Sequence, residues 1–105
     1  MAVHPSKSDD QTDDRDNLAL ELRRTGRSFA FIARTLSLGR ARDANAAFLR
    51  ALENSPASER KQLRTEELGR LKQLEETIKS NATLAPFDRD RQLQVVKQLR
   101  TRLAG

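Results

Sequence analysis

The sequence predicts an all-α protein in which a three-helix unit precedes a two-helix antiparallel hairpin. The chain lacks tryptophan, tyrosine and cysteine and has four phenylalanines, so its core must come mainly from leucine, alanine, isoleucine and valine, which favours helices. Apolar residues recur at helical spacing in successive blocks, and no stretch alternates with period two for long enough to predict a strand. With 105 residues, the chain has room for one modest core.

Residues 1–15 are expected to be a disordered acidic tail, because they hold almost nothing apolar to bury. Residues 1–17 carry aspartates against only Lys7 and Arg15, a balance of −3, so the remainder carries +8 within a formal net charge of +5. A basic body with a short acidic tail is common among proteins that bind nucleic acid, since phosphate neutralisation supplies most of their non-specific affinity.

The first helix is expected from about residue 16 to Thr25, with Asp14 or Asp16 as its cap and Gly26 as its stop. The acids before it also match several ligand positions of a calcium-binding hand. Arg15 stands where the sharp turn of that hand needs glycine, so no metal site is predicted. The positions expected to be buried in this helix are Leu18, Ala19 and Leu22.

Two further helices complete the unit assigned to residues 16–54. Ser28 is the expected cap of the second, residues 29–36, in which Ala33 is small enough to let another helix cross closely. A turn at residues 37–39 precedes the third, expected from about residue 40 to Glu53. The third helix is expected to bury Ala44, Ala47, Phe48, Ala51 and Leu52.

The second half, residues 55–105, is expected to form the hairpin. Pro56 suits the first turn of a helix that reaches about Ser80, and Asp88 is the expected cap of a last helix from about residue 89 to 103, after a loop at 81–87. The two helices present apolar stripes for packing on each other or on a second copy, and we favour a homodimer. The stripes are Leu68, Leu71, Leu74 and Ile78, and Leu93, Val96, Leu99 and Leu103.

The second and third helices and their turn have the spacing of a helix-turn-helix, in which the later helix enters the major groove of DNA. Arg40, Arg42 and Asn45 are the candidates for base readout, because arginine suits guanine and asparagine suits adenine. Every cation from residue 18 to 54 is arginine, whose planar fork suits phosphate. The phosphate-contact candidates are Arg23, Arg24, Arg27, Arg34 and Arg50.

A resemblance points the same way. The segment NLALELRRTGRSFAFIARTLSLGRARDANAAFLRAL, followed by QLRTEELGRLKQLEETI at residues 62–78, resembles the helix-turn-helix, homeodomain-like segments of small actinobacterial and phage proteins. Phe31 and Leu38 stand where a tyrosine is typical. The resemblance implies a DNA-binding fold shared with transcription regulators, phage excision factors and small terminase subunits, and it does not choose among them.

We therefore expect a protein that binds double-stranded DNA as a transcription regulator or nucleoid-associated protein. The alternative is an adaptor that docks on RNA polymerase or a phage packaging motor through the same helices. An enzyme is not expected, since His4 is the single histidine and no nucleophile has a base beside it. No cofactor, metal, small-molecule ligand or membrane association is expected either. The acidic N-terminus and the lack of a long apolar run predict a cytoplasmic protein at the nucleoid.

Overall fold

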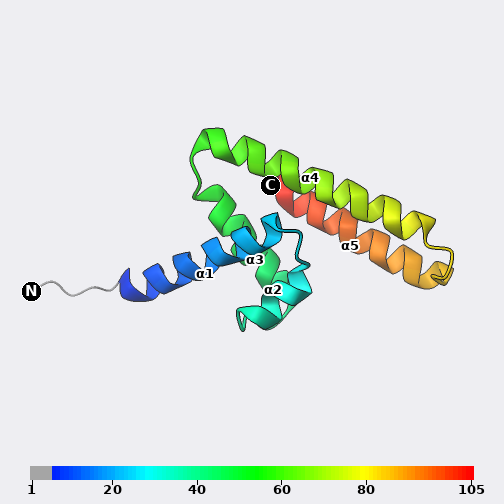
Figure 1. Ribbon diagram of the computed structural model, residues 1–105, viewed down its shortest axis with the longest axis horizontal. Helices are drawn as coiled ribbons and strands as arrows, with labels where there is room; N and C mark the ends of the chain where they lie inside the picture. The colour runs from blue at the N-terminus through cyan, green and yellow to red at the C-terminus, as the bar shows by residue number, and fades with distance from the viewer. Residues whose placement is uncertain (1–5) are drawn as a thin grey trace, which may run out of the picture. The chain divides into compact units, whose positions relative to one another are not determined.

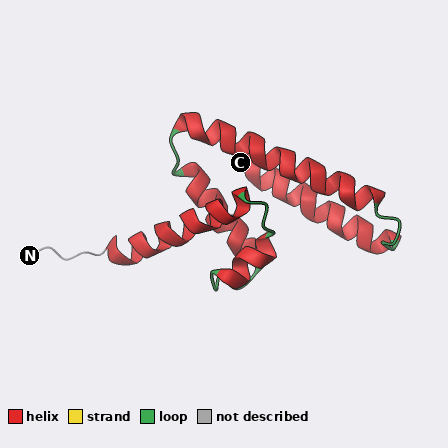
Figure 2. Cartoon of the chain, viewed as in Figure 1, coloured by secondary structure: helices red, strands yellow, loops and turns green. Residues whose placement is uncertain are grey.

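The computed structural model describes the backbone of residues 6–105 and the side chains from residue 12 onward. Over this range the chain is all-helical, without a strand (Figures 1 and 2). The helices are α1 (Ser6–Arg24), α2 (Phe29–Thr35), α3 (Ala41–Glu53), α4 (Ala57–Ser80) and α5 (Pro86–Ala104). They fall into two compact units, which divide between Arg60 and Lys61, inside the first turns of α4 and a little beyond the division expected at residue 54.

Helix α1 begins much earlier than expected. Its first residue is Ser6, so residues 6–15, which were assigned to a disordered tail, are helical, while residues 1–5 lie outside the described range. The segment contains neither glycine nor proline, and its aspartates lie near the positive end of the helix dipole. Asp14 and Asp16 therefore lie within α1, and the prediction that one of them caps it is wrong.

The connection from α1 to α2 follows the expectation. Gly26 has φ +94°, the left-handed conformation that ends many helices. The Arg27 N–H donates back to the Leu22 carbonyl at 3.2 Å, and the Gly26 N–H donates to the Arg23 carbonyl at 2.9 Å. The Ser28 hydroxyl then accepts from the Phe31 N–H at 3.1 Å and caps α2 as predicted.

Helix α2 ends in the same way as α1, with a residue in the left-handed conformation, but here that residue is a serine and not a glycine. The Leu38 N–H donates to the Ala33 carbonyl at 2.8 Å, and Ser37 takes the left-handed position with φ +55°. Gly39 follows with φ +93°, and the Asp43 carboxylate accepts from the Arg40 N–H at 2.9 Å at the start of α3. The turn is therefore a defined structure with hydrogen bonds at both ends.

The core of the first unit lies where α3 packs on both α1 and α2 (Figure 1). Phe48 of α3 is fully buried, and its ring lies 5.7 Å from that of Phe29 in a tilted arrangement. Ala33 is buried in α2, as its proposed place at a helix crossing requires. The expected buried positions of α3 are all buried, namely Ala44, Ala47, Phe48, Ala51 and Leu52.

The buried side of α1 differs from the prediction. Leu18 is 51% exposed, and Leu22 is only half-buried. The buried stripe instead holds Asp16, Ala19, Leu20 and Arg23. The stripe was misplaced because two of its members are charged residues, which are seldom buried unless they are paired.

In the second unit, α4 and α5 run side by side in opposite directions (Figure 1). The Arg100 guanidinium of α5 donates to the Glu75 carboxylate of α4 at 2.9 Å. Pro86 occupies the first turn of α5, so this helix begins before Asp88, which lies within its first turn and does not cap it as expected. Of the apolar stripes, Leu71, Ile78, Val96, Leu99 and Leu103 are buried, Leu93 is half-buried, and Leu68 and Leu74 are exposed.

Candidate nucleic-acid interface

The outward face of α3 is the surface on which the sequence placed base readout. Arg42 and Ala46 are exposed and Leu49 is half-buried, so one stripe with spacing i, i+4, i+7 faces away from the core. Asn45 is not part of this face, because its exposed fraction is only 3%. Since α1 and α2 both cover α3, its buried arc is wide and extends to Asn45. The assignment of Asn45 to base readout is therefore wrong for this conformation.

The turn before α3 is flanked by exposed cations. Arg34 lies in the last turn of α2, and Arg40 and Arg42 lie at the start of α3. Within the described part of the chain, no hydrogen bond or ion pair engages the side chains of these three residues. Asp43, the acid nearest to them in sequence, instead accepts the Arg40 backbone N–H. The start of α3 thus presents guanidinium groups available for an anion.

Arg50, predicted to contact phosphate, is engaged by an ion pair within the first unit. Its Nε and one terminal nitrogen each donate to a different oxygen of the Asp16 carboxylate, both at 2.9 Å. The Asp16 side chain is 4% exposed, while that of Arg50 is 53% exposed. Hydrogen bonding to the Asp16 carboxylate raises the pKa of Arg50 above its ordinary value, and the negative charge of Asp16 adds to this against the opposing effect of burial. Arg50 therefore ties α3 to α1.

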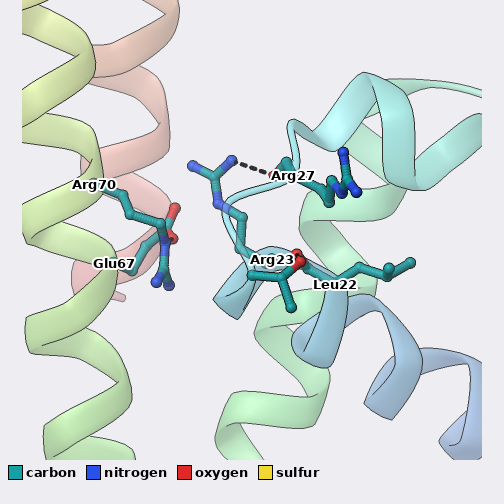
Figure 3. Close-up of polar contacts among 6 residues, drawn as sticks. Leu22, Arg23, Arg27, Glu67 and Arg70 are labelled. Atoms are coloured by element: carbon teal, nitrogen blue, oxygen red, sulfur yellow. Dashed lines mark hydrogen bonds and ion pairs between the residues drawn. The ribbon is translucent and has the colours of Figure 1, made fainter.

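Arg23, also predicted to contact phosphate, is buried with an exposed fraction of 7%. Its guanidinium donates to the Arg27 carbonyl at 3.0 Å (Figure 3). It also lies 4.0 Å above the centre of the Phe29 ring. These contacts satisfy a cation on the buried side of α1. The prediction of a surface phosphate contact at Arg23 is therefore wrong for this conformation.

Two remaining phosphate candidates are exposed. Arg24 ends α1, and Arg27 follows it, with its guanidinium 4.8 Å from the centre of the Phe31 ring. Phe31 is half-buried and Arg27 is exposed, so a guanidinium stacked on this ring can keep its outer nitrogens accessible to a further partner. The exposed arginines therefore flank both ends of α2.

A third buried charge, in the second unit, was also not predicted. Glu67 of α4 is 2% exposed and accepts from the Arg70 Nε at 2.8 Å (Figure 3). The helical spacing i, i+3 could have indicated this ion pair, but not the burial of its carboxylate.

Comparison of the chain with known family models, curated proteins and solved structures gave no match. Among residues 6–105, none of the helices is both long enough and apolar enough to cross a lipid bilayer.

Proposed function

We propose that the first unit is a helix-turn-helix module that binds double-stranded DNA, with α3 in the major groove and α2 across the phosphate backbone. The observation that carries the proposal is the exposed start of α3, where Arg40 and Arg42 follow a defined turn without an acidic partner among the described residues. Helices of this kind contact base edges mainly through their first residues. The chain would then act as a transcription regulator or a nucleoid-associated protein.

The contacts divide between two roles. Arg40 and Arg42 read bases, while Arg24, Arg27 and Arg34 contact phosphates on either side of α2. Five of the candidate arginines are therefore proposed to contact DNA. Arg23 and Asn45 are not included because they are buried, and Arg50 is not included because it is paired with Asp16.

The proposal includes a homodimer formed by the second unit, a hairpin of α4 and α5. A single small module buries only about 600–1,000 Å² on DNA, which is little for tight specific binding. Leu68 and Leu74 on α4 and Val95 on α5 are 42–53% exposed, so apolar surface is available for a second copy. Two linked modules would bind two half-sites, and analytical ultracentrifugation of the free protein tests the association.

The DNA-binding proposal is tested by fluorescence anisotropy with a labelled duplex over a series of salt concentrations. We expect the affinity of the full chain to fall steeply as salt rises, because each phosphate neutralised releases counterions. Replacing both Arg40 and Arg42 with alanine should weaken binding at least tenfold. Arg91→Ala, which removes an exposed cation from α5, serves as the control and should change binding by less than threefold.

Two results would contradict the proposal. One is an absence of duplex binding at low salt, and the other is an equal loss in the α3 double variant and the α5 control. Binding to a protein partner that hardly responds to salt would instead favour the adaptor.

A further inference from the structure

The middle of the outward face of α3 is apolar. Ala46 and Leu49 lie one and two turns beyond Arg42 on the same stripe. Asp43 is occupied with the Arg40 N–H, and Arg50 is held by Asp16. Between Arg42 and the last turn of the helix, then, this stripe offers no uncommitted hydrogen-bonding side chain.

An apolar stripe in the major groove restricts which bases can lie against it. Every base presents a hydrogen-bond donor or acceptor there, and covering such a group without pairing it costs free energy. Thymine is the one base that presents a methyl group, which an apolar side chain can contact favourably. A small residue at position 46 also lets the helix backbone approach the base edges closely.

We propose that Ala46 and Leu49 select thymine, through its 5-methyl group, within about three base pairs of the guanine contacted by Arg42. This inference rests on the proposed DNA-binding function. The rise of about 1.5 Å per residue places Ala46 roughly 6 Å and Leu49 roughly 10 Å along the helix from Arg42. At about 3.4 Å per base pair, these distances place the selected thymines at most roughly two and three base pairs from the guanine bound by Arg42, since an inclined helix advances less along the duplex than along its own axis.

The experiment begins with selection of bound duplexes from a random pool by the full chain. In a recovered sequence, each thymine is replaced in turn by deoxyuridine, which removes only the methyl group. We expect affinity to fall about fourfold at one or two thymines, as the loss of one buried methyl predicts. Replacement elsewhere in the duplex should have little effect.

Protein variants assign the effect to its side chains. In Leu49→Ala the penalty for deoxyuridine at one thymine should disappear, and in Ala46→Gln the penalty at the other should disappear. Ala46 is exposed, so Ala46→Gln keeps the fold even if Leu49→Ala proves unstable. Leu18→Ala, which shortens an exposed leucine on α1, is the control and should retain both penalties.

The outcomes distinguish failure of thymine selection from failure of the proposed DNA binding. Recovery of no duplex would overturn both. Binding that depends on Arg40 and Arg42 but changes less than twofold with every deoxyuridine, or that shows no sequence preference, would overturn thymine selection and leave DNA binding in place.

Discussion

The ion pair between Asp16 and Arg50 allows the sharpest test of how the first unit is held together. Replacing Arg50 with alanine leaves the Asp16 carboxylate, 4% exposed, without its partner. Breaking a fully buried pair costs about 3–5 kcal/mol, and an exposed pair contributes about 0–1 kcal/mol. Because Arg50 is half in solvent, the cost should lie between these limits, and we expect Arg50→Ala to lower the free energy of unfolding by about 2 kcal/mol.

The double variant predicts the sign of the coupling energy between Asp16 and Arg50. Asp16→Ala should cost about 1 kcal/mol, because the exposed Arg50 can be solvated once its partner is gone. Asp16→Ala combined with Arg50→Ala should be more stable than Arg50→Ala alone, since it removes the unpaired carboxylate. The coupling energy is expected to be about 1.5 kcal/mol.

The assay is urea unfolding of the full chain followed by circular dichroism, with Asp14→Asn and Arg42→Ala as exposed controls within 0.5 kcal/mol of the parent. A coupling energy below about 0.3 kcal/mol would refute the reasoning. Arg50→Ala should also leave DNA affinity within about twofold under folding conditions, unlike a phosphate-contacting arginine.

Three further predictions concern single positions. Ser37→Gly should raise the melting temperature by a few degrees, since glycine relieves the left-handed strain at φ +55°; a fall would contradict this account of the turn. Arg100→Ala should raise the pKa of Glu75 towards its ordinary value in an NMR titration, because the Arg100 hydrogen bond is the main cause that lowers it. The stability from this pair is therefore present above the unfolded pKa and lost as pH falls through the lowered one, and an unmoved pKa would refute the pairing. Ala33→Leu should lower the free energy of unfolding in urea by about 1–3 kcal/mol, because the buried site has no room for the larger side chain. Ala30→Leu, at an exposed position of the same helix, is the control and should have little effect. Equal losses in the two variants would contradict the placement of Ala33 at the helix crossing.

Helix ends in the first unit could be predicted where local chemistry decides them. Gly26 supplies a left-handed residue and Ser28 a capping oxygen, and both effects act within a few residues of the chain. The buried face of α3 was predictable for a related reason. Its apolar residues recur at helical spacing, and these are the residues that pack against α1 and α2.

The errors involve residues whose partners are distant in sequence. Asp16 is buried because Arg50, on another helix, satisfies it, and no local pattern reveals that pairing. Asn45 is buried because two helices flank α3 and widen its covered arc. The predicted site residues that do not lie on the exposed surface are therefore polar residues that the sequence pattern placed in solvent but that other helices cover.

The charged ends of the α1 stripe fix the position of this helix on its neighbours. Ala19 and Leu20 alone would tolerate a shift of α1 along its axis, since small apolar contacts resemble one another from turn to turn. A shift by one turn would pull Asp16 from Arg50 and Arg23 from the Phe29 ring, leaving both charges covered and unmatched. The ion pair and the cation–π contact thus disfavour neighbouring registers and help to hold a small, alanine-rich core in a single arrangement.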